Sequence, residues 1–320
     1  MAGASRFGDF VLLKKLSEDA LGEIYRAGQM AGDSLSKVML LRLYTGLDGE
    51  ALAAAMSARA VGLADGPGLL APRATGVVEG LAFSAYDYVS GKDLPSLARR
   101  ANDGFSALAA EHAVLIVERL AKGLALLHAG GASGEAICHG FLVPQLIWVS
   151  NEGEARLLGF EAGPGLARLD LGRRSELEPY RSPETRTGGE PGPPDDVYAL
   201  GAIFFELLTG RPPAPAQDVE SQLQRATLIA DHQPLPDGLA NVLRHSLAPA
   251  PSRVADAGRW HQMLSRYMSD AGVRATHFDL AFFMHELYRD EIHREDDELA
   301  EEKSQAIQTV SSAAVPTVAP

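Results

Sequence analysis

The chain of 320 residues changes character near Gly91, and this change restricts the folds that it can adopt. Before Gly91, short apolar or β-favouring runs alternate with Gly, Asp and Ser, which is typical of strands joined by turns. After Gly91, long segments carry apolar residues at helical spacing. We therefore expect an α+β protein of two lobes, with a small β-rich lobe first and a larger helical lobe second.

The predicted elements can be placed along the chain by these two periodicities. Strands are predicted at 10–16, 22–27 and 37–44, and as a pair within 76–89 around the turn Glu79-Gly80. Helices are predicted at 48–64, 111–128, 196–209, 239–247 and 254–268. Gly210 and Pro212 follow the helix at 196–209 and provide a stop signal.

Charge and cysteine content exclude several classes of function. The chain has 29 basic and 42 acidic residues and a net charge of −13, which argues against binding to nucleic acid or to an anionic membrane. Its single cysteine, Cys138, allows neither a disulfide framework nor a thiolate metal site. No apolar run is long enough to span a membrane, and the first residues lack the layout of a secretory signal. A cytoplasmic location is the expectation.

The C-terminal region forms a separate part of the sequence. An aromatic-rich amphipathic stripe at 278–292 leads into an acidic run at 295–302, and from residue 304 the composition predicts disorder or a linker. The expected divisions are a β-rich lobe at 1–90, a helical lobe at 91–272, a terminal helix at 273–303 and a tail at 304–320. The helix either packs on the body or docks in a partner's groove. The candidate partner-binding residues are Phe278, Phe283, Leu287 and Tyr288.

Eight short segments appear in an order that has a known counterpart. They are FVLLKKLSEDALGEIYRA at 10–27, VMLLRL at 38–43, YDYVSGKDL at 86–94, HGFLVPQLI at 139–147, LLGFE at 157–161, SPE at 182–184, DVYALG at 196–201 and PSR at 251–253. Together they resemble the landmarks of the protein-kinase family, in particular bacterial Ser/Thr kinases, over about residues 8 to 270. The resemblance implies a two-lobed kinase fold with a hinge near residues 86–91.

The same resemblance assigns residues to the positions that perform phosphoryl transfer, and the required chemistry is missing from them. Leu41 stands at the strand lysine and Ser57 at the helix glutamate. Phe141 stands at the catalytic base and Val143 at the supporting lysine. Leu146 stands at the asparagine and Gly159 at the metal-binding aspartate. The glycine-rich loop positions hold Ser17, Asp19 and Gly22. Asp19 would bring negative charge to the phosphate site. Since Mg²⁺ needs oxygen ligands and the triphosphate needs cations, catalysis is not expected.

Positions with a structural role in the family are retained. His139 and Phe160 match the hydrophobic stack between the lobes, Asp196 matches a buried acceptor of backbone N–H bonds, and Glu184 and Arg253 match a C-lobe ion pair. The cations near the lost lysine, Lys14, Lys15 and Arg42, are expected at the surface.

We therefore interpret the chain as a pseudokinase that uses no cofactor or metal. It would act as a scaffold or allosteric regulator, binding a protein partner through the activation segment at 159–184 or the C-terminal helix. Two alternatives are open: a metal-independent nucleotide-binding protein that uses the hinge, and an enzyme with unconventional transfer from ATP.

Overall fold

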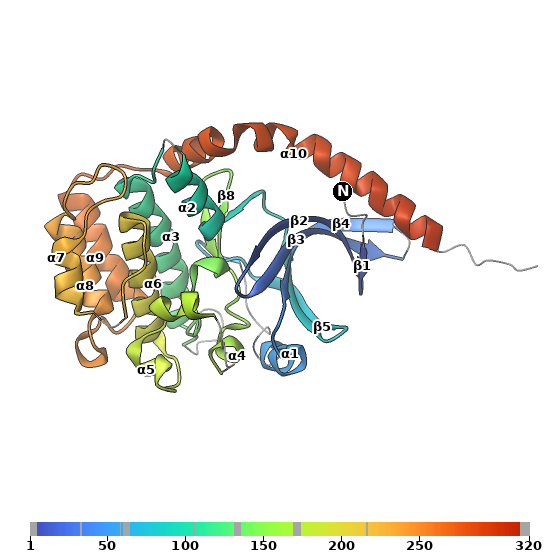
Figure 1. The fold of residues 1–320 in the computed structure, drawn as a ribbon. Coiled ribbons are helices and arrows are strands. Elements are labelled where there is room, and N and C mark those ends of the chain that lie inside the picture. Colours follow the sequence, from blue (N-terminus) through green and yellow to red (C-terminus); the bar gives the residue numbers. More distant parts are fainter. Residues whose placement is uncertain are drawn as a thin grey trace, which may run out of the picture.

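The structure is a computed structural model of the chain. It describes residues 5–32, 34–57, 59, 65–104, 106–130, 136–168, 174–215 and 217–313, with side chains up to residue 304. Figure 1 shows two lobes, a curved sheet and a bundle of helices, with one long helix running across both. The predicted two-lobed α+β architecture is confirmed.

The N-terminal lobe is built on an antiparallel sheet in the order β1-β2-β3-β4-β6-β5. Its strands are β1 (Ser5–Phe7), β2 (Phe10–Asp19), β3 (Gly22–Ala31), β4 (Ser34–Tyr44), β5 (Pro72–Val78) and β6 (Leu81–Asp87). Helix α1 (Gly49–Ser57) packs against β5 and β6. The helix was predicted to reach residue 64, but residues 58 and 60–64 lie outside the described part of the chain.

The C-terminal lobe is mainly helical. A small sheet of β7 (Gly91–Asp93), β8 (Ile147–Ser150) and β9 (Ala155–Leu157) lies next to the hinge. The helices are α2 (Leu94–Asp103), α3 (Ala110–His128), α4 (Gly163–Arg168), α5 (Pro183–Arg186), α6 (Pro193–Thr209), α7 (Val219–Arg225), α8 (Asp237–Leu247), α9 (Ala257–Asp270) and α10 (His277–Ala313). Three 3₁₀ turns, η1 (Pro144–Leu146), η2 (Ser175–Tyr180) and η3 (Ala250–Ser252), complete the lobe.

The core of this lobe follows from the apolar faces of its helices. The central helices α3 and α6 contact each other, α9 packs on α3, and α8 packs on α6. Trp260 of α9 is fully buried and meets Phe204 of α6 edge to face, with 6.2 Å between ring centroids. Gly210 ends α6 with a φ of +78°, a left-handed conformation that favours glycine. Among the described residues, no helix has the length and apolar content to cross a membrane.

Helix α10 differs from its prediction in two respects. It continues to Ala313, so residue 303 is not a boundary; residues 314–320 lie outside the described part of the chain. Its first half packs on the C-terminal lobe, because Phe283 and Tyr288 are only 5% and 4% exposed, and Leu287 is half-buried. These three are therefore not the free docking residues that we expected, since their apolar surface is used within the chain. Phe278 remains exposed.

A pair of variants tests this packing of α10. Met284 is fully buried, so Met284→Ala should lower the free energy of unfolding by about 2–5 kcal/mol, because it leaves a cavity in the core. Phe282 lies two residues away and is 66% exposed, so Phe282→Ala should change stability by less than about 0.5 kcal/mol. Urea denaturation of both variants measures the difference. Equal effects would mean that α10 is not docked.

Candidate functional site

The site that the resemblance implies is the cleft between the lobes, and β4 lines it on the side of the N-terminal lobe. Leu41 points to the other face of the sheet and packs with Phe10 and Phe83. Arg42 faces the cleft, where its guanidinium donates to the carbonyl of Gln145 in the C-terminal lobe at 3.4 Å. Leu41 is thus not the cleft residue that we expected, and Arg42 is not an exposed cation, since it is only 2% exposed. A slip of one residue along a strand moves each side chain to the opposite face.

The charge of Arg42 is neutralised within the chain. Its two terminal nitrogens donate to the two carboxylate oxygens of Asp19 at 2.7 and 2.5 Å, and both side chains are largely buried. Burial lowers the pKa of Arg42, but the adjacent Asp19 more than compensates and the net shift is upward. The guanidinium therefore stays charged. It is held by Asp19, and the negative charge expected at the phosphate site is balanced.

The glycine-rich loop is a tight turn folded into the core. Asp19 accepts the backbone N–H of Leu21 at 2.8 Å, and the Leu21 side chain is fully buried. Gly22 has a φ of +134°, and a Cβ there would lie 2.0 Å from the carbonyl oxygen of Leu43. Glycine at 22 thus serves the close approach of β3 to β4. Ser17 is paired with Ile24 in the β2–β3 ladder.

Aromatic and aliphatic side chains fill the part of the cleft beside the hinge. The cluster there consists of Ile24, Leu40, Leu70, Tyr86, Trp148 and Leu158, none more than 5% exposed. The indole N–H of Trp148 donates to the hinge carbonyl of Val89 at 2.9 Å. The Val89 carbonyl of the hinge is therefore already bonded to a side chain of the C-terminal lobe.

The two metal-ligand positions are apolar and lie against each other. Leu146 is 1% exposed and contacts Gly159, where a Cβ would lie 2.8 Å from a Leu146 methyl carbon. Gly159 also has a φ of +76°, which L-residues rarely adopt. Phe141 and Val143 are buried as well. Among the described residues, no group of three or more His, Cys, Asp or Glu side chains could hold a metal ion.

Ser57 does not reach the cleft in the way a glutamate partner of the strand cation would. It is the last residue of α1, it is exposed, and its hydroxyl donates to the carbonyl of Ala53 in its own helix at 3.0 Å. The inward residue of this last turn is Met56, which is fully buried. The described part of α1 therefore offers an apolar surface to the cleft.

The carboxylate of Glu161 follows the metal-ligand position but turns toward β6. One oxygen accepts hydrogen bonds from Ser84 Oγ and Tyr86 Oη, both at 2.6 Å, and the residue is fully buried. The other oxygen has no hydrogen-bond donor among the described residues. Burial raises the pKa of Glu161, with the two hydroxyl donors acting in the opposite direction. Sequence reasoning missed this residue and Trp148, since both are set by packing across the cleft.

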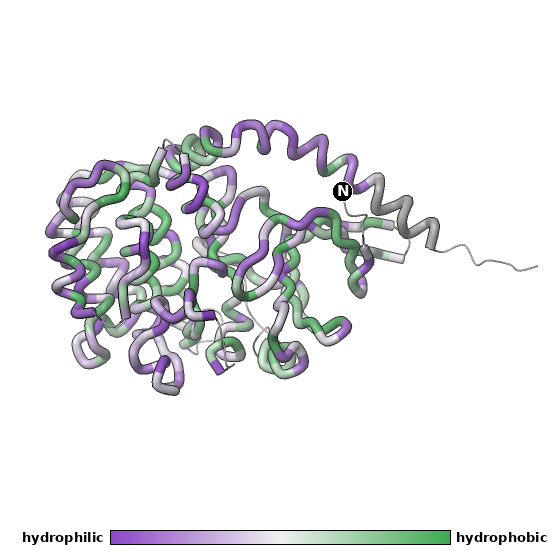
Figure 2. Tube along the Cα trace, in the orientation of Figure 1, coloured by the Kyte–Doolittle hydropathy of each residue, from purple (hydrophilic) through white to green (hydrophobic). Residues whose placement is uncertain are grey.

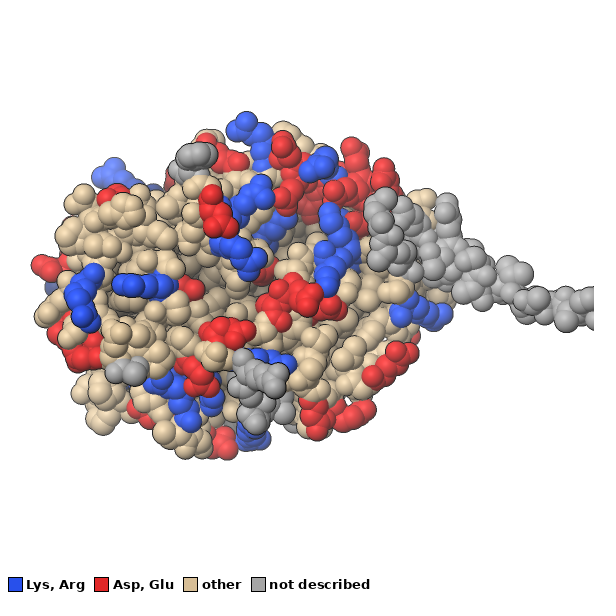
Figure 3. Space-filling view, in the orientation of Figure 1, with Lys and Arg blue, Asp and Glu red and all other residues tan. Residues whose placement is uncertain are grey.

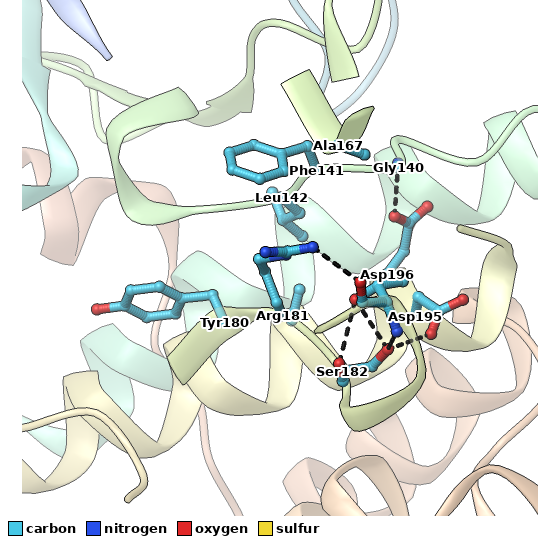
Figure 4. Close-up of a pocket in the computed structure, with 11 residues that line it drawn as sticks. Gly140, Phe141, Leu142, Ala167, Tyr180, Arg181, Ser182, Asp195 and Asp196 are labelled. Carbon is cyan, nitrogen blue, oxygen red and sulfur yellow. Dashed lines mark hydrogen bonds between the residues drawn. The ribbon is translucent and has the colours of Figure 1, made fainter. Parts of the chain in front are cut away.

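The retained structural positions form the contacts expected of them. Asp196 accepts the backbone N–H groups of His139 at 2.5 Å and Gly140 at 2.9 Å, and it lies 2.9 Å from His128 Nε2. Figure 4 shows this carboxylate below Gly140, with a dashed line for the hydrogen bond between them. Burial lowers the pKa of His139, so its imidazole is neutral and bonded to the Leu158 carbonyl at 2.9 Å.

Two further retained positions anchor the activation segment. Glu184 Oε2 accepts from the Arg253 guanidinium at 2.9 Å, and Phe160 is fully buried in the main core. Arg174 donates to the carbonyls of Ala20 and Thr45, so the activation segment also contacts the β2–β3 turn and the end of β4 in the N-terminal lobe.

Comparison with known proteins agrees with this geometry. No family model matches the chain. It is 28% identical over 293 residues to serine/threonine-protein kinase PknH of Mycobacterium bovis, which covers 89% of this chain and 45% of the relative. It is 29% identical over 275 residues to serine/threonine-protein kinase PknD of Mycobacterium tuberculosis, covering 83% and 38%. The chain thus spans less than half the length of these relatives.

Solved structures show the same fold. The PknI kinase domain of Mycobacterium tuberculosis superposes with a TM-score of 0.61 at 20% identity, covering 83% of this chain and 99% of that domain. The apo form of PpkA-294 has a TM-score of 0.59 at 20% identity, covering 82% and 99%. The chain is thus similar in sequence to bacterial serine/threonine-protein kinases and has the protein-kinase fold.

The Asp19–Arg42 pair can be tested by a double-variant experiment. Arg42→Met should lower the free energy of unfolding by about 3–5 kcal/mol, because it leaves the Asp19 carboxylate buried without a counter-charge. Adding Asp19→Asn removes that charge and should recover most of the loss. Urea denaturation of the single and double variants gives the coupling. A double variant no more stable than Arg42→Met would contradict the pairing.

Glu161 gives a prediction about pH. Because its folded-state pKa lies above the unfolded value, folding favours the protonated form. That stabilising contribution is complete below the unfolded pKa and is lost as the pH rises through the folded pKa. Glu161→Gln keeps the shape and the hydroxyl contacts but cannot ionise, so its stability relative to the native protein should increase as the pH rises. Thermal unfolding between about pH 4 and pH 8 measures this, with the partly exposed Glu178→Gln as control. If the difference in melting temperature between Glu161→Gln and the native protein is constant across that range, Glu161 does not have the raised pKa.

Proposed function

We propose that this chain is a pseudokinase: a protein of the kinase family that regulates or scaffolds a signalling partner and does not transfer phosphate. The observation that carries the proposal is the contact between Leu146 and Gly159, where two metal-holding side chains are expected in a kinase. Mg²⁺ in proteins is held by oxygen ligands, and neither position supplies one. Glu161, the neighbouring carboxylate, is committed to Ser84 and Tyr86.

Two independent features support the same proposal. The cleft cation Arg42 is held by Asp19 and is not available to neutralise a triphosphate. The hinge region is filled by Trp148 and its apolar neighbours, which favours a closed cleft over the alternative of metal-independent nucleotide binding. A protein whose cleft is filled by its own side chains must act through its outer surfaces.

The partner surface that remains open differs from the one first expected. The activation segment is retained as a candidate, because Tyr180 and Arg181 line a shallow hollow together with Phe141 (Figure 4). On the described part of α10, the exposed aromatic side chains are Phe278 and Phe282, at 72% and 66%. These are spaced four residues apart and so lie on one outward face of the helix.

Nucleotide binding is the direct test of the proposal. A ligand present at about 100 times its Kd stabilises a protein by about 2.7 kcal/mol, which raises the melting temperature of a domain this size by several degrees. We expect no measurable rise with millimolar ATP, with or without Mg²⁺, and no transfer of labelled phosphate to the chain or to a generic substrate. An active bacterial serine/threonine kinase domain serves as the positive control. A rise without Mg²⁺ would support nucleotide binding, and turnover above background would overturn the proposal.

A further inference from the structure

Helix α10 consists of two parts with different neighbours. The backbone at Tyr288 is not helical, with φ −123° and ψ 24°, so the axis bends there. The first part is held on the C-terminal lobe by buried Leu280 and Met284 and by the ring of Phe283, which lies 4.8 Å from the His112 ring. The second part leaves this lobe and passes over the hinge to the N-terminal lobe (Figure 1).

The second part carries a row of carboxylates on one face. Glu291, Glu295, Glu298 and Glu302 follow one another at intervals of four, three and four residues, which brings them to the same side of a helix. This spacing is visible in the sequence, within and just before the acidic run at 295–302. In the structure all four residues are partly buried and all form ion pairs with the body of the protein.

Arg26 of β3 is the central contact of this row. Its guanidinium is only 2% exposed and binds Glu302 through two nitrogens at 2.7 and 2.5 Å. The same group lies 3.3 Å from Glu295 and 3.7 Å from Glu298. Lys14 of β2 adds a contact to Glu298 at 2.5 Å. The Arg26 guanidinium thus contacts three carboxylates of the helix, which makes it the point where the helix meets the N-terminal lobe.

The same row also binds the hinge and the C-terminal lobe. Glu295 accepts from Tyr88 and Ser90 in the hinge and from Asn151 in the turn after β8. Glu291 pairs with Lys92 at 2.7 Å and with Arg100 at 3.4 Å. One helical segment therefore connects the N-terminal lobe, the hinge and the C-terminal lobe through side-chain charges.

The interface beneath this segment is polar and incompletely packed. A cavity of about 140 Å³ remains between α10 and the mouth of the cleft, lined by Lys14, Arg26, Lys92, Glu295 and Glu298 among others. Figure 2 shows the hydrophilic character of this stretch, and Figure 3 shows acidic and basic side chains gathered together there. The apolar part of its lining includes Leu16 and Ile292, which are only partly buried. Attachment by charges at a partly exposed surface is weakened by salt.

We propose that residues 289–304 of α10 form a releasable electrostatic strap that holds the two lobes in one fixed arrangement. Docking of the strap selects a closed cleft, and its release allows the lobes to move about the hinge, which shifts the population of conformations. A polycationic segment of a partner, competing for the four carboxylates, is the kind of ligand that would release it. The strap concerns lobe geometry and does not depend on whether the cleft binds nucleotide.

Hydrogen exchange on the full chain tests the strap. The variant Glu295→Gln/Glu298→Gln/Glu302→Gln removes three inward charges, while the matched control Asp290→Asn/Asp296→Asn/Asp297→Asn removes three exposed ones. Amides at 290–302 should exchange about tenfold faster in the first variant, because local opening becomes easier, and should be nearly unchanged in the control. Equal exchange in the two variants would overturn the proposal.

A distance measurement tests the effect on the lobes. Spin labels at Glu50→Cys and Arg266→Cys, on a Cys138→Ala background, place one probe on each lobe. The distance distribution should be narrow in this background and in the outward control, and should broaden in the inward variant. A narrow distribution despite faster exchange of α10 would show that the strap does not hold the lobes.

A salt series protects the test against a variant that fails to fold. In the unmodified sequence, raising NaCl from about 0.05 M to 1 M should speed exchange at 290–302 while leaving the amides of α3 protected, because salt screens partly exposed charges. Exchange at 290–302 that does not respond to salt would also overturn the proposal. Because none of these measurements involves ATP, their outcome is independent of the nucleotide-binding result.

Discussion

The buried ion pair between Asp19 and Arg42 governs the arrangement of the cleft. In an active kinase, a strand cation must be free to meet a phosphate group. Here the turn after β2 brings a carboxylate to the cation, and the Leu21 side chain at its tip enters the core. Removing two charges from water is costly unless each is fully paired, so the pair is stable only while the loop stays folded inward. The collapsed loop and the neutralised cation therefore depend on each other.

In the rest of the cleft, too, groups of the chain are bonded to or packed against one another. Leu146 fits against Gly159, and Trp148 donates to the hinge carbonyl of Val89. In contrast, Asp196 still accepts the backbone N–H groups of His139 and Gly140. Buried backbone groups must be satisfied in any folded protein. The contacts of Asp196 therefore order this loop through its backbone, whichever side chains the loop carries.

The sequence was sufficient for the fold, because ordered motifs and long amphipathic helices carry that information locally. It was insufficient where a contact joins distant segments. The assignment of Leu41 depended on a strand register that a single residue shifts, and only the contact with Asp19 identifies Arg42 as the cleft residue. The carboxylate row of α10 had a visible period, but its partner Arg26 lies 276 residues away from Glu302 along the chain.

Two kinds of connection hold the lobes together, and their physical difference matters for function. The cleft contacts of Arg42, Leu146 and Trp148 are buried, so salt screens them little and solvent-borne ligands do not reach them. The carboxylates of α10 are more exposed, because Glu298 and Glu291 retain 35% and 40% side-chain exposure, although their neighbour Arg26 is as buried as Arg42. The proposed regulator needs a part that can change conformation while its core stays folded. The strap satisfies that requirement because it can open at a free-energy cost below that of unfolding, whereas the filled cleft cannot.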